Sequence, residues 1–397
     1  MPLGCIISCK LNATEKVICL KRVIGFVKSE AVLVIACALA VVSAFFVPPD
    51  KEYLGYIDFR TLGILFCLMA VVAGFRRLGV FDVLAQALLK KVKNVRQLAA
   101  VLMLMCFFLS MLITNDVALL TFVPFTFVLL EMTGEQTERR WLISAVAMQT
   151  IAANLGSMLT PLGNPQNLYL YGKSGINLGE FLLLMLPYSA LSLLLLVAWC
   201  FVKDAKGTAS LFVSFPEPAR ISGKKRLVMY AALFVVCLLA VLHVIHWGIA
   251  LAAVLVFVAA ADRKTLLSVD YSLLITFVGF FVFIGNMGRI PAFRSFLEAV
   301  VSGNEVITAL LSSQVISNVP AALLLSEFSA DCPALIVGTN LGGLGTLIAS
   351  MASLISFKQL AAKYPEKKSR YLLVFTVSNI AFLAALLLLR VLLNGAL

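Results

Sequence analysis

The 397-residue sequence has little charge and lacks the motifs of common enzymes. Charged residues make up 13% of the chain and hydrophobic residues 61%, with a mean hydropathy of +1.02, whereas soluble globular chains carry about a quarter charged residues. It has no HExxH zinc motif, no GxSxG nucleophile motif and no GxxxxGK[ST] phosphate loop. The composition therefore excludes a water-soluble protein. The missing motifs argue against an enzyme and against an ATP-driven pump.

Histidine is scarce, and the cysteines form no recognisable framework. The two histidines, His243 and His246, lie beside Trp247 at the expected end of a span, where an interfacial position is favoured over metal binding. The nine cysteines are scattered, mostly within apolar runs, and contain no CxxC pair. We interpret them as small apolar residues. The sequence thus predicts no disulfide framework, no metal centre and no bound cofactor.

Long apolar runs fill most of the chain. Runs of about 15–24 residues with little charge can cross roughly 30 Å of hydrocarbon as helices, and they lack the alternation of barrel strands. Two further stretches, 98–130 and 304–331, are interrupted by polar residues and are interpreted as re-entrant hairpins. The predicted fold is an all-α polytopic membrane protein with about nine full spans and two hairpins. The expected spans are 31–47, 61–75, 141–170, 178–202, 227–242, 247–261, 273–287, 334–357 and 371–393.

The placement of basic residues predicts the orientation. With the N-terminus inside and the C-terminus outside, all but six of the 32 lysines and arginines fall in short cytoplasmic loops, as the positive-inside rule requires. The net charge of +12 therefore indicates topology and no nucleic-acid partner. The expected organisation is a retained cytoplasmic tail (1–30), a first repeat (31–202), a basic linker (203–226), and a linking span with a second repeat (227–397).

Four elements recur in the same order in the two halves of the chain. Both halves contain a span that begins after an aspartate, an amphipathic segment, a hairpin with an Asn at its tip, and an Asn-Leu-Gly segment with a Thr six residues after the Asn. The tips are Thr114-Asn115-Asp116 and Ser317-Asn318-Val319. Because the halves enter the membrane from opposite sides, the repeats are predicted to be inverted, an arrangement typical of secondary transporters.

Polar breaks within the apolar runs carry the predicted binding chemistry. Residues 154–167 contain two glycines, two prolines and three asparagines, so this span is expected to unwind, as is 334–357. Freed carbonyls can coordinate a cation, and a helix start can face an anion. The alternative role for the glycines is close helix packing, and for Thr114 and Ser317 it is helix capping. The predicted substrate- or ion-binding residues are Thr114, Asn115, Asp116, Asn154, Gly156, Thr160, Gly163, Asn164, Asn167, Ser317, Asn318, Asn340, Gly342, Gly345 and Thr346.

The tips differ at one position. Asp116 stands where the second half has Val319, and a carboxylate at membrane depth costs at least about 2.5 kcal/mol unless it is hydrated, paired or protonated. Asp116 is therefore the predicted residue for coupling to protons or sodium.

These motifs resemble the ion transporter superfamily of divalent anion:sodium symporters, citrate permeases, arsenite permeases and one class of sodium/proton antiporters. The similarity covers residues 31–393 and implies a scaffold, a mobile transport domain, elevator-type movement and a homodimer. In the symporters, Ser-Asn-Thr tips bind a carboxylate and nearby carbonyls bind sodium. By position this points to Thr114 and Asn115 and to Ser317 and Asn318, with sodium expected at Asn115, Asn154, Asn318 and Asn340. Asp116 and Val319 depart from the pattern, which leaves proton coupling or efflux more open.

The sequence therefore predicts a multi-pass transporter in the cell (inner or plasma) membrane. It would move a small anion, a carboxylate or an inorganic oxyanion, by symport or antiport driven by a proton or sodium gradient. The alternative transport function is cation/proton antiport or metalloid efflux. A non-transporting membrane scaffold is disfavoured because the expected soluble loops are short. The expected partners are the small anion and the lipid bilayer.

Overall fold

The computed structural model is all-helical in the part of the chain that it describes, which is Gly25, Val27 and residues 30–203 and 218–395. Most of the predicted tail (1–30) and much of the basic linker (203–226) lie outside the described residues. The chain forms two compact units. The small unit contains residues 1–58 and 270–294, and the large unit contains residues 59–269 and 295–397.

The small unit is built on the packing of two apolar helices. Its helices are α2 (Ala31–Phe46), the short α3 (Tyr53–Tyr56) and α13 (Tyr271–Gly288). A Cβ atom at Gly279 of α13 would lie 3.0 Å from the backbone of Ala36, so the glycine allows the close approach of α2. Asn286 donates hydrogen bonds to the hydroxyls of Ser43, at 3.0 Å, and Tyr53, at 2.8 Å. Helices far apart in the sequence thus share one polar joint.

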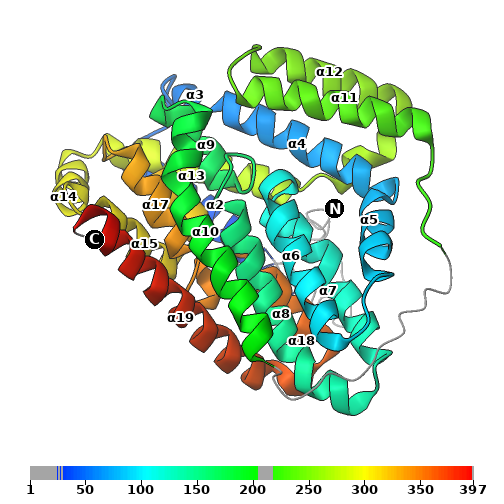
Figure 1. Cartoon of the computed structure of the whole chain (residues 1–397). Helices are drawn as coiled ribbons and strands as arrows, with labels where there is room; N and C mark the ends of the chain where they lie inside the picture. The colour runs from blue at the N-terminus through cyan, green and yellow to red at the C-terminus, as the bar shows by residue number, and fades with distance from the viewer. Residues whose placement is uncertain (1–24, 26, 28–29, 204–217, 396–397) are drawn as a thin grey trace, which may run out of the picture. The chain divides into compact units, whose positions relative to one another are not determined.

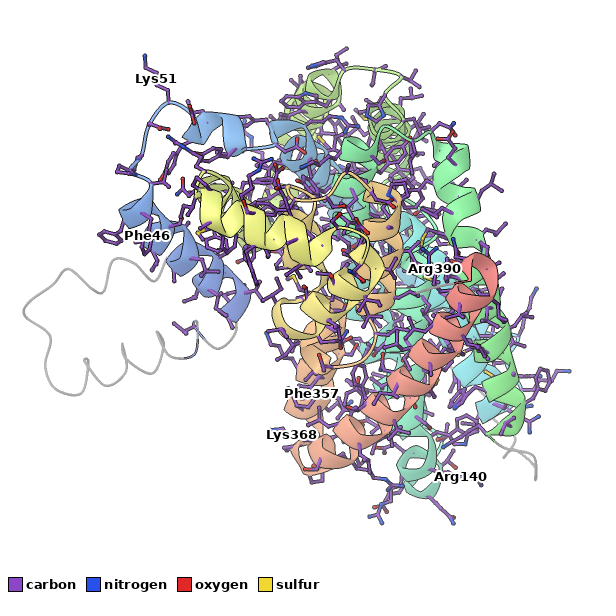
Figure 2. All side chains as sticks on the ribbon, turned by 90° about the vertical axis from the view of Figure 1, so that its left-hand side faces the viewer. Phe46, Lys51, Arg140, Phe357, Lys368 and Arg390 are labelled. Atoms are coloured by element: carbon purple, nitrogen blue, oxygen red, sulfur yellow. The ribbon has the colours of Figure 1, made fainter. Side chains whose placement is uncertain are left out.

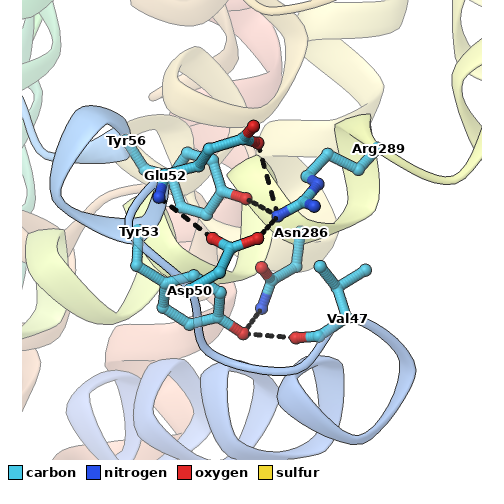
Figure 3. Close-up of polar contacts among 7 residues, drawn as sticks. All are labelled: Val47, Asp50, Glu52, Tyr53, Tyr56, Asn286 and Arg289. Carbon is cyan, nitrogen blue, oxygen red and sulfur yellow. Dashed lines mark hydrogen bonds and ion pairs between the residues drawn. The ribbon is translucent and has the colours of Figure 1, made fainter.

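Charged residues surround the end of α13 (Figure 3). The guanidinium of Arg289 lies 2.7 Å from Asp50 and 3.4 Å from Glu52, and it donates to the Tyr56 hydroxyl at 3.1 Å. The hydrogen bond from Arg289 holds the pKa of Asp50 below its usual value. These contacts of Arg289 join the segment 50–56, which follows α2 and includes α3, to the end of α13.

The large unit contains a first group of helices packed on α4 (Figure 1). An ion pair with a buried carboxylate closes one end of this group: Arg77 donates to Asp262 at 2.8 Å, and the Tyr230 hydroxyl donates to the same carboxylate at 3.1 Å. Gly74 faces the Tyr230 ring so closely that any Cβ atom would collide with it. The members of the group are α4 (Phe59–Arg77), α5 (Val80–Leu89), α11 (Lys224–Val241), α12 (Trp247–Ala261) and the 3-10 helix η2 (Arg263–Ser268).

A second group of helices surrounds α8 and α17. Helix α8 is buried along its whole length from Trp141 onward and packs against α6, α7, α10, α18 and α19. Helix α17 packs against α9, α15 and α16. The group consists of α6 (Val95–Ile113), α7 (Asn115–Glu131), α8 (Glu135–Ser157), α9 (Pro165–Ser174), α10 (Leu178–Val202), α15 (Glu305–Ile316), α16 (Asn318–Leu325), α17 (Cys332–Gly342), η3 (Leu347–Ala349), α18 (Met351–Lys363), η4 (Pro365–Lys367) and α19 (Lys368–Asn394). Helix α14 (Pro291–Val301) contains residues of both units.

Fewer helices than expected are continuous spans. Five of the described helices are long and apolar enough to cross a bilayer: Phe59–Arg77, Val95–Ile113, Leu178–Val202, Tyr271–Gly288 and Pro365–Asn394. One of them, α6, is the first arm of the predicted hairpin 98–130. Other predicted spans are broken or short, because polar residues interrupt 141–170 and 334–357, and because α2 and α12 have only 16 and 15 residues. The count of about nine full spans remains a prediction.

Loops that the charge pattern places on the same side lie together in the large unit. Arg140 and Lys368 occupy the same end of the unit, and Arg390 lies far along α19 from them (Figure 2). At that end Lys367 of η4 forms an ion pair with Glu138 of α8 at 3.2 Å. The two halves of the chain therefore meet at their basic ends.

Candidate functional site

Two hairpins turn on a single residue each. Helix α6 ends at Ile113 and α7 begins at Asn115, so only Thr114 links them, with φ 70° and ψ 148°. In the second half Ser317 links α15 to α16 with φ 74° and ψ 154°. A residue with a side chain in this region of backbone space costs on the order of 1–3 kcal/mol, and such residues concentrate at functional sites. The two tips share one strained geometry, which places an asparagine first in each following helix.

The first break lies between α8 and α9. Helix α8 continues through Asn154 and ends at Ser157, so the unwound part is 158–164, later than the sequence suggested. Pro161 has no N–H to donate to the Ser157 carbonyl four residues earlier, which ends the helix. Asn164 then caps α9 by accepting from the Asn167 backbone N–H at 2.9 Å, and Pro165 occupies the first helical position.

The Asn154 side chain forms hydrogen bonds with residues of both halves of the chain, and we call this cluster a node. It accepts hydrogen bonds from the Asn115 amide at 3.0 Å and from the Ser350 hydroxyl at 2.9 Å. It donates to the Ser353 hydroxyl at 3.2 Å. Asn115 and Asn154 are 5% and 6% exposed. The first tip, the end of α8 and the start of α18 are therefore joined by one buried amide.

The Asn340 side chain forms the matching node in the second half. It accepts from the Asn164 amide at 3.1 Å, and it donates to Asn167 Oδ1 at 2.6 Å and to the Ile336 carbonyl at 2.8 Å. Asn340 is 4% exposed and Asn167 is fully buried. The end of α17 is thus joined to the start of α9, as the end of α8 is joined to the start of α18.

The two nodes correspond position by position. In each half, the Asn near the end of the first half-helix is bonded by the residues that stand at the start of the resuming helix in the other half. Those residues stand four and seven positions after Thr160 in the first half and after Thr346 in the second half. The corresponding pairs are Asn154 with Asn340, Asn164 with Ser350, and Asn167 with Ser353.

The two threonines also make the same contact. Thr160 donates its hydroxyl hydrogen bond to the Met111 carbonyl, and Thr346 donates to the Gln314 carbonyl at 3.1 Å. Met111 and Gln314 each stand three residues before the strained tip residue. Both threonines therefore tie a broken helix to the first arm of its own hairpin, and neither hydroxyl hydrogen is left for a ligand in this conformation.

The predicted glycines lie where helices or loops approach closely. A Cβ atom at Gly156 would collide with the Phe107 carbonyl of α6, and one at Gly342 would lie 2.7 Å from the Ser313 hydroxyl of α15. Gly163 is in contact with the Ser157 backbone. Gly345 has φ 109° and lies against the Gln314 amide. Each of these glycines is therefore in a place where a side chain would not fit, and a binding role for them stays a prediction.

Asp116 and Val319 occupy corresponding places with different surroundings. Asp116 is half-buried in the first turn of α7, where the helix dipole favours a carboxylate, and its backbone N–H donates to Asn115 Oδ1 at 3.0 Å. Val319 is 5% exposed in the first turn of α16. Asn318 is also buried, with its amide 3.0 Å from where a Cβ atom of Gly343 would be.

The sequence analysis missed several polar residues of this region. Ser350 and Ser353 could have been found by extending the repeat four and seven residues past Thr346, where the first half has asparagines. Gln166 carried no such signal. It is 1% exposed, and neither its Oε1 nor its Nε2 has a hydrogen-bond partner in the described chain. A fully buried amide without partners requires water or a bound solute.

The hydrogen-bonded clusters around Asn154 and Asn340 are built from neutral groups. Every hydrogen-bond partner found for the Asn154 and Asn340 side chains is an amide, a hydroxyl or a carbonyl. Within the described ranges no three histidine, cysteine, aspartate or glutamate residues are grouped so that they could hold a metal. The arrangement can bind a small polar solute through amide donors and hydroxyls, and sodium at the four predicted asparagines remains a prediction.

Apolar helices that enclose two broken helices and two strained hairpin tips define a multi-pass membrane transporter and not an enzyme. Comparison with known families agrees with this class. Residues 17–332 match the family model described as "Citrate transporter" (CitMHS). The chain belongs to this family, which lies within the ion transporter superfamily that the motifs indicated.

Individual relatives extend over most of the chain. The inner membrane protein YbiR of Escherichia coli K12 is 33% identical over 323 residues, which is 79% of this chain and 84% of the relative. An uncharacterised transporter of Methanocaldococcus jannaschii, MJ0456, is 32% identical over 77% of this chain and 82% of its own length. A silicon efflux transporter of rice, LSI3, is 33% identical over a shorter stretch, 33% of this chain and 26% of its own.

Proposed function

We propose that this protein is a secondary active transporter of a small anion, a carboxylate or an inorganic oxyanion, coupled to a proton or sodium gradient. Two inverted repeats would form its transport module, and a homodimer in the cell membrane would carry out elevator-type alternating access. The observation that supports this most is the crossed pairing of the two broken helices through Asn154 and Asn340.

Unused amide donors favour an anion. In the described chain the Nδ2 group of Asn115 bonds only Asn154, and that of Asn154 bonds only Ser353. Each amide nitrogen carries two hydrogens, so each retains one N–H for a ligand. The two side chains are 3.0 Å apart, at the first turn of α7, where the helix dipole also favours negative charge. Converging neutral donors can bind an anion without the cost of a buried basic residue.

The crossed bonds also favour movement of both halves as one body. Separating α8 and α9 from α17 and α18 would break at least four buried hydrogen bonds. Each has a net value of about 1 kcal/mol, and orphaned groups cost more. A module that carries its site intact avoids this cost, which supports an elevator over rocking of one half against the other.

Counterflow in proteoliposomes tests the substrate class. Vesicles loaded with one of several carboxylates or oxyanions would be assayed for uptake of the labelled anion under sodium, proton or no gradient. We expect flux for at least one anion, and we expect Asn115→Asp to abolish it, because a carboxylate replaces the spare donor at constant size. Thr126→Ser, a buried hydroxyl on the same helix outside the site, is the matched control. Absence of flux for every anion under each gradient would reject the proposal.

A second candidate is efflux of a neutral hydroxylated metalloid acid. The relative named as a silicon efflux transporter and the neutral partners of the Asn154 and Asn340 side chains favour it. A solute that both donates and accepts hydrogen bonds could use the spare donors and the buried Gln166 amide. Counterflow with silicic or arsenous acid separates the two functions, since Asn115→Asp should impair transport of such a solute much less than transport of an anion.

Asp116 is the proposed coupling residue. Asp116→Asn keeps the size and removes the charge, so a proton gradient should no longer drive uphill transport while downhill exchange of the solute persists. Unchanged proton-driven accumulation in Asp116→Asn would remove this carboxylate from the mechanism. The corresponding substitution in the second half, Val319→Ala, should leave coupling intact.

A further inference from the structure

A side-chain amide fills the second break, which is the segment 343–350 between α17 and α18. Gln314 of α15 places its Nε2 atom 2.8 Å from the Gly342 carbonyl oxygen, 2.9 Å from that of Leu344 and 3.2 Å from that of Leu310. Its Oε1 atom accepts from the Thr346 backbone N–H at 2.9 Å. One amide therefore bonds two carbonyls and one N–H of the broken segment, and also the Leu310 carbonyl of its own helix.

Three carbonyl dipoles that converge on one point create a position for positive charge. A broken helix within a membrane leaves carbonyls without their usual partners, and these must be satisfied by a cation, water or a donor from the protein. In secondary transporters such unwound carbonyls are where coupling cations are held. Here the Nε2 atom of Gln314 lies at that point, and its two hydrogens are shared among the three oxygens.

In the first half, the hairpin supplies no side-chain amide to the carbonyls of the break. The position that corresponds to Gln314 is Met111, whose thioether cannot donate a hydrogen bond. The carbonyls of Ser157, Met158 and Thr160 are instead approached by the Asn167 amide at 3.2–3.5 Å, a longer set of contacts than Gln314 makes. The hairpin of the second half therefore closes its break in a way that the first half does not.

The second tip also lacks the carboxylate that the first tip carries. Val319 is buried where the first half has the carboxylate of Asp116. A monovalent hard cation is held by several oxygen ligands. In the described residues of the second break, a cation would therefore find the Gly342 and Leu344 carbonyls already bonded to Gln314 and no carboxylate at the tip.

We propose that Gln314 is a specificity-determining residue, whose amide takes the place of a cation in the second break and so excludes sodium from that half. This inference rests on the proposed function and adds that sodium does not act through the second half. Any coupling ion would then act on the first half.

Sodium-dependent thermal stability tests the proposal without requiring transport. The full-length protein in detergent would be melted over a series of NaCl concentrations, with N-methylglucamine chloride keeping ionic strength constant. Gln314→Ala empties the carbonyl cluster, so its melting temperature should rise with sodium concentration, by roughly 2 °C for each tenfold increase once the site fills. The wild-type protein should rise less, because any sodium that it binds would act through the first half alone.

Two further variants keep the test decisive. Gln314→Glu keeps the size but needs a cation between its carboxylate and the carbonyls, so its sodium-specific shift should be at least as large as that of Gln314→Ala. Met111→Ala, the matching change in the first half, should not gain a shift. A shift that is equal in wild type and in both Gln314 variants, or absent from both variants, would overturn the proposal. A chain that transports no solute yet shows the expected shifts would reject the proposed function alone.

Discussion

The crossed amide nodes predict unequal costs for two single substitutions. Asn340→Ala removes three hydrogen bonds, those with Asn164, Asn167 and Ile336. Ser350→Ala removes one, to an oxygen that still accepts a second bond. At about 1 kcal/mol for each bond, we expect the free energy of unfolding to fall by about 3 kcal/mol in Asn340→Ala and about 1 kcal/mol in Ser350→Ala.

The measurement is unfolding of the purified protein in mixed micelles of dodecyl maltoside and SDS. The expected difference of about 2 kcal/mol corresponds to roughly a 30-fold change in the unfolding equilibrium constant. Ser144→Ala is the control, because the Ser144 hydroxyl is buried but bonds only the Trp141 carbonyl of its own helix, at 3.1 Å. It should remain close to wild type.

A double substitution isolates the bond between the halves. Asn154→Ala combined with Ser350→Ala should cost about 1 kcal/mol less than the sum of the two single changes, because both remove the same hydrogen bond. If Asn340→Ala and Ser350→Ala had equal costs, or if the double substitution were additive, the nodes would not join the two halves energetically.

Two further predictions concern packing and pH. Gly74→Ala should lower the melting temperature, with a cost of about 1–3 kcal/mol from overpacking against the Tyr230 ring. Gly288→Ala is the control and should leave the melting temperature unchanged, because nothing lies within 4 Å of the added Cβ atom. Equal melting temperatures for the two variants would contradict the close packing of Gly74 on Tyr230. Arg289 lowers the pKa of Asp50 below its ordinary value in the folded protein. The stability that this carboxylate contributes is therefore present above the ordinary pKa and is lost as the pH falls through the lower pKa of the folded state. The acid limb of the melting-temperature profile should therefore flatten in Asp50→Asn, and an unchanged limb would mean that the pair adds nothing to stability.

The breaks and tips were predictable because local chemistry determines them. Prolines within an apolar run end helices by removing an N–H, whatever surrounds them, and the break after Ser157 follows from Pro161. The helix nevertheless continued through Asn154, since an asparagine whose side chain finds partners elsewhere does not disturb its own backbone. The start of the break was therefore set by tertiary contacts that no local pattern contains.

The crossed pairing was not predictable in the same way. Spacing showed that Asn154 and Asn340 correspond, but not that each would be bonded by the other half. Ser350 and Ser353 are chemically unlike Asn164 and Asn167, so the repeat looked shorter than it is. The glycines show the opposite case, because Gly156 and Gly342 are equally compatible with ligand approach and with helix packing until the neighbouring α6 and α15 are placed.

The departures from symmetry separate the roles of the two halves. Asn340 uses both hydrogens of its amide within the protein, on Asn167 and Ile336. In the described chain the Asn154 amide donates only to the Ser353 hydroxyl, which leaves one of its two N–H hydrogens unused. Gln314 also closes the second break, where the first half has Met111. The two halves therefore share the hydrogen bonds that join them and differ in the polar groups next to each break, so substitutions at these differing positions are the ones that test the proposed binding roles.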